Sequence, residues 1–222
     1  KIVGVDLDQR QAESPKVDYI THCPECQTPL VRQEGEAHHY CPNLNHCPPQ
    51  IIGRIEHFIS RKAMDIDGLG GETVALLVSN QLIDNYSDLY TLSKSQLLPL
   101  ERMADKSADN LIQGIEKSKE QPFHRVLFAL GIRFVGETVA QNLAKHFKSI
   151  DALIGASKEE LVAVEDIGER IADSVISFFA DESHLKVIDR LKSFGLQFSG
   201  HESVVTISDQ LKGCNVVVSG VF

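Results

Sequence analysis

Four cysteines lie close together in the first quarter of the chain, and their spacing is that of a metal site. They follow the pattern Cys-x2-Cys-x14-Cys-x5-Cys. Zn²⁺ in a structural site takes four donors in a tetrahedron, and a Cys-x2-Cys knuckle presents two thiolates from one turn. A proline follows the first, third and fourth cysteines and fixes the chain just beyond each of these ligands. The pattern predicts a zinc ion held by Cys23, Cys26, Cys41 and Cys47.

The predicted zinc site is expected to be structural. Four thiolates close the coordination shell, whereas a catalytic zinc keeps one position open for water. Disulfides are the alternative, and they are disfavoured because residues 1–5 do not resemble a signal peptide. Cys214 lies far away in an apolar run and is interpreted as a buried core thiol. Four nearby histidines could replace a cysteine, but we interpret them as solvated or as neighbours of the ligands: His22, His38, His39 and His46.

A second stretch that could do chemistry is the glycine-rich segment Asp67–Leu77, which is predicted to be a hairpin opening onto an apolar helix. Glycines at 68, 70 and 71 permit positive φ and a close approach of the backbone to a ligand. The start of the helix leaves N–H groups without an intrahelical partner, and such a helix start can seat a phosphate. For a single copy, the alternative is an ordinary tight turn between two packed helices.

The same spacing recurs three more times, which favours a repeat protein. The further copies are Arg102-Met103-Ala104 with Ala108, Phe134-Val135-Gly136 with Ala140, and Asp166-Ile167-Gly168 with Ala172. The last hairpin positions are 70, 104, 136 and 168, so that the steps are 34, 32 and 32 residues. A second register, from Ser93 to Ala108, maps onto Ser157 to Ala172 at an offset of 64. The repeats therefore form two units, each of which buries apolar faces that a lone hairpin would expose.

The hydrophobic pattern predicts helices over most of residues 63–199. Helices are expected at 51–62, 107–119, 171–179 and 183–194, the last of them ending at Gly195. Ser93 and Ser157 are candidate N-cap residues. The predicted core residues are Leu89, Leu97, Leu111, Leu127, Leu130, Leu143, Leu161 and Ile176.

Composition places the chain among globular proteins and limits how it could bind nucleic acid. Hydrophobic residues make up 42% and charged residues 24%, and the absence of an 18-residue apolar run predicts a soluble, cytosolic protein. The net charge is −9, of which residues 63–199 carry −7, and this argues against a general polyelectrolyte contact with DNA. Any DNA contact should be local, weak in isolation, and made by backbone amides and a few cations such as Lys106, Arg133 and Arg170.

The order of these features resembles the C-terminal half of bacterial NAD⁺-dependent DNA ligases. The four cysteines carry the resemblance, together with the stretches Asp65–Gly70, Asp105–Ala108 and Leu130–Thr138. Residues 1–7 are similar to the last strand of that family's OB-fold, and Leu211–Gly220 is similar to the first strand of a BRCT domain.

The resemblance implies a mainly α fold, in which a small four-cysteine zinc module is followed by two double helix-hairpin-helix units and the chain ends are short and strand-like. The implied domains are an OB-fold tail and linker (1–20), the zinc module (21–62), four helix-hairpin-helix repeats (63–199), and a linker with the first strand of a truncated BRCT domain (200–222).

Members of that family seal DNA nicks by adenylating a lysine from NAD⁺, passing AMP to a 5′-phosphate and closing the bond with Mg²⁺. The resemblance implies that this stretch encircles nicked double-stranded DNA and carries none of that chemistry. Lys62, Lys106 and Lys145 lack the adenylation motif around them, so no catalytic residue is assigned and the fragment alone is expected to be inactive. NAD⁺ and Mg²⁺ are expected in a missing N-terminal half. The implied partners are DNA and the ligase's own adenylation and OB domains, with no membrane, in replication and repair in the bacterial cytoplasm at the nucleoid.

The expected DNA contacts are hairpin amides and helix N-termini that meet phosphates across the minor groove without reading bases. Two hairpins depart from the glycine pattern. The second copy is Arg102-Met103-Ala104, and the third copy begins with Phe134. Because larger residues narrow the approach of the backbone to a phosphate, the first and last copies are expected to fit best. The predicted contact residues are Gly68, Gly70, Gly71, Lys106, Ser107, Arg133, Gly136, Thr138, Gly168 and Arg170.

Two other classes of function fit part of the pattern. An acidic helical repeat joined to a zinc module could be a scaffold that binds a protein partner. The charge of −7 on the repeats favours this function. Another helix-hairpin-helix repair protein, such as a glycosylase or nuclease, would need a catalytic carboxylate or lysine at a base pocket, and no motif singles one out. Binding of nicked duplex at low salt would separate the scaffold from the DNA-binding classes.

Overall fold

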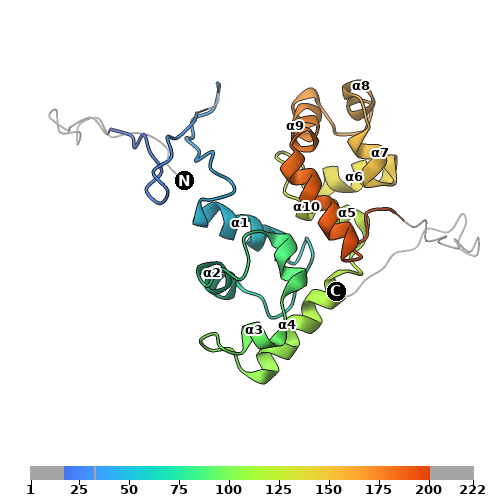
Figure 1. The fold of residues 1–222 in the computed structure, drawn as a ribbon. Helices are drawn as coiled ribbons and strands as arrows, with labels where there is room; N and C mark the ends of the chain where they lie inside the picture. The colour runs from blue at the N-terminus through green and yellow to red at the C-terminus, as the bar shows by residue number, and fades with distance from the viewer. Residues whose placement is uncertain (1–17, 33, 201–222) are drawn as a thin grey trace, which may run out of the picture. The chain divides into compact units, whose positions relative to one another are not determined.

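The computed structural model describes residues 18–32 and 34–200 (Figure 1). The chain divides into two compact units, Lys1–Ser118 and Lys119–Phe222. The described residues are mainly helical and their β-structure consists of isolated bridges, which confirms the predicted fold class. No helix in this part of the chain combines the length and the apolar character needed to cross a bilayer. The strands expected at residues 1–7 and 211–220, and Cys214, lie outside the described residues.

A compact loop structure holds the cysteines at the start of the first unit. The knuckle closes when the Gln27 N–H donates to the Cys23 carbonyl and the Cys23 N–H donates to the Thr28 carbonyl, both at 2.9 Å. Gln27 has a φ of 57°, so the turn is left-handed there. Val31 and Tyr40 then exchange both backbone hydrogen bonds at 2.8 Å. This pairing brings the chain back to the knuckle just before the third cysteine.

The first helix, α1 (Pro48–Ile59), begins directly after the last cysteine of the cluster. Cys47 is its N-cap residue, and proline in the first turn presets φ where no intrahelical N–H bond is lost. The predicted helix at 51–62 therefore starts earlier and ends earlier than expected. The α1 helix packs against the second helix, and the ring of Phe58 stacks on that of Tyr86 with centroids 4.6 Å apart. The buried face of α1 consists of Ile51, Ile55, Phe58 and Ile59.

Three more α-helices and a 3-10 helix complete the first unit. They are α2 (Gly71–Ser79), η1 (Tyr86–Thr91), α3 (Lys94–Leu97) and α4 (Asp105–Ser118). The α3 helix packs against α4, and both α1 and α4 contact η1. The hydroxyls of Tyr90 and Ser118 lie 2.9 Å apart and fasten η1 to the end of α4.

The second unit contains the other two repeats. Its helices are α5 (Phe123–Ala129), α6 (Glu137–Phe147), α7 (Ile150–Ile154), α8 (Lys158–Val162), α9 (Glu169–Ala180) and α10 (Glu182–Ser193). The α5 helix packs against α6, and α8 packs against α9. The α7 and α10 helices lie against α6 and α9, respectively (Figure 1). Each unit thus holds one pair of repeats, while the finer domain bounds stay predictions.

Both predicted serine N-caps are confirmed. The Ser157 hydroxyl accepts from the Glu160 N–H at 3.2 Å, and the Glu160 carboxylate accepts from the Ser157 N–H at 2.8 Å. The Ser93 N–H donates to the side-chain oxygen of Gln96 at 2.9 Å. The helices predicted at 107–119 and 171–179 both begin two residues earlier, and Gly195, with a φ of 91°, follows the last helix as expected.

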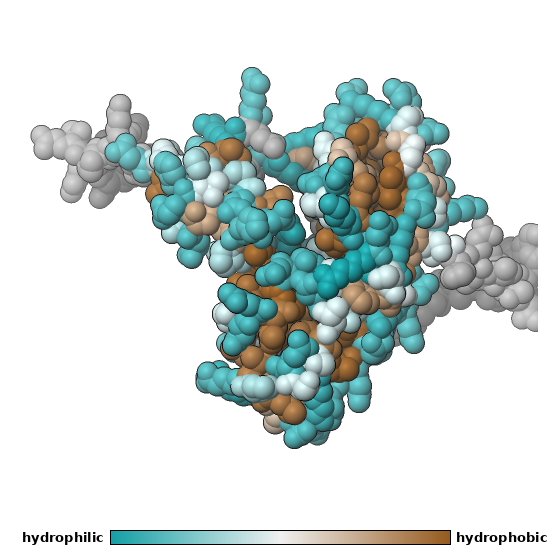
Figure 2. Space-filling model, viewed as in Figure 1, coloured by the Kyte–Doolittle hydropathy of each residue, from teal (hydrophilic) through white to brown (hydrophobic). Residues whose placement is uncertain are grey.

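The predicted core is confirmed at seven of its eight positions and wrong at Ile176. The side chain of Ile176 is 39% exposed, because α9 buries its face at Ala172, Val175 and Phe179 instead. Ile176 lines a shallow groove over α7, α8 and α9, where Figure 2 shows apolar side chains gathered on the surface. The confirmed core residues are Leu89, Leu97, Leu111, Leu127, Leu130, Leu143 and Leu161.

The backbone of α4 comes unusually close to the turn that precedes α2. A Cβ atom added to Gly114 would lie 2.5 Å from the carbonyl oxygen of Asp67 and 3.3 Å from its nitrogen. Such a contact involves backbone on both sides and cannot be relieved by a side-chain rotation. Glycine at position 114 is therefore required for α4 to pack on this turn.

We predict that Gly114→Ala destabilises the first unit by about 1–3 kcal/mol, because the added methyl group overlaps the Asp67 oxygen. This cost exceeds the roughly 0.5–1 kcal/mol that alanine normally gains over glycine inside a helix. Gly53→Ala is the matched control, because Gly53 lies within α1 and has open space around it, so that this variant should be more stable. Thermal unfolding measures both; a stabilised Gly114→Ala chain would contradict the prediction.

Candidate metal centre and nucleic-acid interface

The four cysteines converge on one point, as their spacing predicts. Their sulfur atoms all lie within 4.8 Å of one another. The Cys23 and Cys47 sulfurs are 3.8 Å apart, and those of Cys26 and Cys41 are 3.5 Å apart. A tetrahedron with Zn–S bonds of about 2.3 Å has sulfurs about 3.8 Å apart, whereas a disulfide needs about 2.05 Å. The arrangement fits a structural zinc ion, and these cysteines form no disulfide.

The protein around the cysteines disfavours the thiolate at two of them and favours it at one. Burial raises the pKa of the Cys47 thiol to about 12 and also raises that of Cys41. Cys26 is less buried, and its hydrogen bond with Thr28 lowers its pKa to about 6. A bound metal ion deprotonates coordinating thiols. A zinc ion would therefore supply the positive charge that stabilises the thiolates of the three buried cysteines and of Cys26 in one site.

The histidines near the cluster keep the role expected from the sequence. Each of the four is exposed, and the atoms grouped for a metal ion belong to cysteines. The ring of His39 stacks on that of Tyr19, with centroids 6.1 Å apart. The four histidines are His22, His38, His39 and His46.

Four hairpins, which we number in chain order, share one backbone geometry. They are hairpin 1 (66–70), hairpin 2 (100–104), hairpin 3 (132–136) and hairpin 4 (164–168). The third residue of each is left-handed, with φ of 80°, 62°, 65° and 64°. These residues are Gly68, Arg102, Phe134 and Asp166.

The three glycines of hairpin 1 differ in backbone conformation. Only the first of the three, Gly68, has positive φ, whereas Gly70 is extended with a φ of −106° and Gly71 begins α2. Of the three glycines that permit positive φ, Gly68 is thus the one that adopts it. Gly70 can still form part of a phosphate site, because an N-cap glycine has no side chain that would cover the N–H groups at the start of the helix.

The hydrogen bonds of the hairpins also repeat. In each copy the carbonyl of the last hairpin residue accepts the first helical bond, at 2.9–3.1 Å. The donors are Val74, Ala108, Ala140 and Ala172, all fully buried. The three N-cap glycines, Gly70, Gly136 and Gly168, offer no side-chain cap. The first-turn amides of these helices therefore face outward without a capping side chain.

The predicted contact residues lie on the hairpins and the first turns behind them. All are exposed except Gly71, which is half-buried. Lys106 and Ser107 lie in the first turn of α4, and Thr138 lies in the first turn of α6. In hairpins 1, 3 and 4 the fourth residue turns inward instead, and Leu69, Val135 and Ile167 are buried.

Carboxylates occupy the same helix starts, which the sequence reasoning did not weigh. Glu72, Asp105, Glu137 and Glu169 lie in the first turns of α2, α4, α6 and α9. A carboxylate there interacts favourably with the partial positive charge of a helix N-terminus. The same carboxylate repels a phosphate, so a hairpin needs neutralising cations to accept one.

Two lysines supply such cations at equivalent positions of the two units. Lys94 Nζ lies 3.0 Å from Asp105 and 2.8 Å from Asp109. Lys158 Nζ lies 3.6 Å from Glu169 and 2.8 Å from Asp173. The offset of 64 residues holds for all three members of each group. Hydrogen bonds to Asp109 and Asp173 raise the pKa of Lys94 and Lys158, respectively.

Hairpins 3 and 4 are tied together by reciprocal hydrogen bonds. The Asn142 amide of α6 donates to the Glu165 carbonyl of hairpin 4 at 3.1 Å. The Ser174 hydroxyl of α9 donates to the Arg133 carbonyl of hairpin 3 at 2.7 Å. Each donor lies six residues beyond its own N-cap, and each acceptor lies three residues before the other N-cap. The exposed tips of both hairpins are thereby held on one surface of the second unit.

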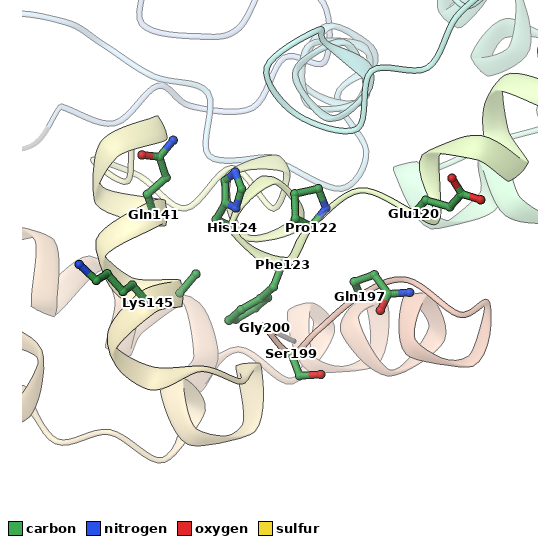
Figure 3. A pocket seen from close by; sticks show the side chains of 10 residues that line it. Glu120, Pro122, Phe123, His124, Gln141, Lys145, Gln197, Ser199 and Gly200 are labelled. Carbon is green, nitrogen blue, oxygen red and sulfur yellow. The ribbon is translucent and has the colours of Figure 1, made fainter. Parts of the chain in front are cut away.

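A cavity of about 750 Å³ in the second unit is separate from this surface. Figure 3 shows His124 of α5, with Gln141 and Lys145 of α6, around it, and Gln197 from the segment after α10. Burial lowers the pKa of His124. None of the ten predicted DNA-contact residues lines the cavity.

Comparison with known proteins gives matches to both parts of the chain. Residues 22–48 match the family described as the NAD-dependent DNA ligase C4 zinc finger domain. Residues 125–188 match the family described as the helix-hairpin-helix motif. The whole chain is 62% identical to a DNA ligase of Christiangramia forsetii, 61% to one of Flavobacterium psychrophilum and 55% to one of Bacteroides fragilis.

The whole chain is therefore similar to one part of a DNA ligase. It spans about a third of the length of these relatives, 34% in each case. The ligase zinc finger match covers all four cysteines and supports their role as the ligands of a structural zinc ion. The hairpin motif match covers hairpins 3 and 4, and the other two copies share their backbone geometry.

We predict that Cys41→Ser releases the zinc and loosens the zinc module (21–62), because metal-binding energy at such a site is folding energy. Bound zinc should fall from one ion per chain to none, and the free energy of unfolding should fall by several kcal/mol. Chelation of the unaltered chain should have the same effect. His46→Ala, at an exposed neighbour, should keep the metal. Zinc content and thermal unfolding test this; an unchanged melting profile after metal removal would refute it.

Proposed function

We propose that this chain is the duplex-binding part of an NAD⁺-dependent DNA ligase that seals nicks in double-stranded DNA during replication and repair. The observation that carries the proposal is the set of four exposed hairpins with one shared geometry, in a chain 62% identical to a DNA ligase. The zinc cluster supports it by fixing the start of α1, whose last residue, Ile59, accepts a hydrogen bond from the N–H of Ile66 in hairpin 1. Adenylation is assigned to other parts of the ligase, and no residue of this chain is assigned a catalytic role.

The proposed mechanism of binding is electrostatic and independent of sequence. First-turn amides behind the N-cap glycines donate to phosphate oxygens, and nearby cations add charge. Contacts of this kind fix the position of a protein on a duplex without reading its bases, which suits an enzyme that must act at any nick. The proposed contact residues are Gly68, Gly70, Gly71, Lys106, Ser107, Arg133, Gly136, Thr138, Gly168 and Arg170.

The proposed partners are nicked duplex DNA and the adenylation and OB domains of the same ligase, and the proposed location is the bacterial cytoplasm, at the nucleoid. Because the chain carries a net charge of −9, we place the DNA contact at the hairpin tips rather than over a broad surface. Binding should therefore involve few phosphates and should weaken with rising salt.

The proposal is tested with Gly168→Asp. Gly168 has extended backbone and open space where a side chain would lie, and aspartate is a good N-cap residue. The variant should keep its stability or gain a few tenths of a kcal/mol, while its carboxylate takes the place of a phosphate on α9. We expect its affinity for nicked duplex at about 50 mM salt to fall about tenfold. Fluorescence anisotropy of labelled DNA measures the affinity.

Gly155→Asp is the matched control. Gly155 is an exposed glycine of the same unit, at the end of α7, and the substitution changes the charge by the same amount. Its effect on DNA affinity should be less than about twofold. Equal affinities of the two variants would remove hairpin 4 from the interface.

The competing function is an acidic scaffold that binds a protein, and the net charge of −9 favours it. This function predicts no binding of nicked duplex by the unaltered chain even at low salt. The same titration therefore separates the two functions before any variant is made.

A further inference from the structure

Hairpin 3 carries a large aromatic residue where the backbone disfavours one. Phe134 has a φ of 65°, and hairpin 1 has Gly68 at the equivalent position. Left-handed backbone is unfavourable for an L-residue with a bulky side chain and marks a true outlier. Residues held in such conformations concentrate at functional sites, and an observed outlier justifies a functional hypothesis.

Packing in the core of the second unit does not explain the phenylalanine. The side chain of Phe134 is 38% exposed, whereas the neighbouring Val135 is 6% exposed and faces the core. A smaller residue at position 134 would leave that core contact in place. The strain at position 134 is therefore not offset by full burial of the ring.

Two guanidinium groups lie beside the exposed ring. The Arg133 group lies 4.8 Å from the ring centroid, and the Arg170 group lies 4.1 Å from it. Arg170 belongs to the first turn of α9, so the cluster joins hairpin 3 to hairpin 4. The bond from Ser174 to the Arg133 carbonyl holds these elements together at 2.7 Å. A partly exposed aromatic ring with two guanidinium groups over it thus lies at the tip of hairpin 3.

The first unit has different chemistry at the matching positions. By the repeat spacing, Asp67 and Gly68 correspond to Arg133 and Phe134, and Lys106 corresponds to Arg170. The first unit thus places one acid and one base where the second places two arginines and a ring. The second unit is therefore the better suited of the two to a polyanion whose groove has apolar sugar surfaces along its walls.

We propose that Phe134 presses against sugars and base edges in the minor groove of duplex DNA, while Arg133 and Arg170 pair with the phosphates on its rims. The inference rests on the proposed function and adds a non-ionic contact to it. Minor-groove proteins use apolar side chains beside arginine in this way. A ring contact explains why a strained phenylalanine stays partly exposed against two guanidinium groups.

The test compares Phe134→Gly with Asp166→Gly in the 222-residue chain. Both variants place glycine at a left-handed hairpin position, so both should keep or raise the melting temperature. Phe134→Gly should lower the affinity for nicked duplex about tenfold. Asp166→Gly, which relieves the same backbone conformation and removes an acid, should leave the affinity unchanged or raise it. Phe134→Asn is a second variant, because asparagine also tolerates this backbone.

The salt dependence separates a ring contact from an indirect effect on the arginines. Phe134→Gly should leave the slope of log affinity against log salt unchanged, whereas Arg133→Gln and Arg170→Gln should each reduce it by about one. Unaltered affinity in both Phe134 variants would overturn the inference and leave the proposed function standing. A reduced slope in both Phe134 variants would also overturn it, because the ring would then act only by holding the arginines. A chain that binds no duplex at all would overturn the proposed function and the inference together.

Discussion

The left-handed turn at the third residue of each hairpin is the constraint on which the rest of the structure depends. It reverses the chain within one residue, so that the next residue can enter the core and the one after it can begin a helix. The same turn forms at Gly68, Arg102, Phe134 and Asp166, although only glycine adopts it without strain. Packing around the hairpins must therefore impose the conformation. The buried residues that follow the turn, at the fourth hairpin position in three copies and in the following helix in all four, are what impose it.

The acidity of this chain is compatible with the proposed DNA binding because charge is arranged locally. The helix starts carry carboxylates that complement their own dipoles, and Lys94 and Lys158 neutralise two of them. Salt screens exposed charges from one another beyond about 8–10 Å at ordinary ionic strength, so distant acidic faces matter less than the few groups at a hairpin tip. The net charge of −9 is thus a poor guide to what the surface around Phe134 attracts.

The sequence predicted the features that depend on residue chemistry and on repetition. Four cysteines at ligand spacing admit few alternatives, and the hairpins were located because their spacing recurs. Features that depend on tertiary packing were harder. The hydrophobic pattern does not show which face of α9 packs against the neighbouring helices. It therefore predicts Ile176 in the core, whereas the side chain is exposed. Two helix starts were placed two residues late, because Ala104 and Gly168 lack the side chains that mark an N-cap. From the sequence, Phe134 is a departure from the glycine pattern of the repeat. Nothing in the sequence indicates that Arg170 lies against its ring.

Cys47 has two roles, as a zinc ligand and as the N-cap of α1. The slow step in forming a helix is fixing its first turn, and here a metal bond and the proline that follows restrict that turn. Zinc binding at Cys47 therefore favours the first turn of α1. At the other end of α1, the ring of Phe58 stacks on that of Tyr86 in η1. One helix thus links the metal ligands to the aromatic pair in the core of the first unit.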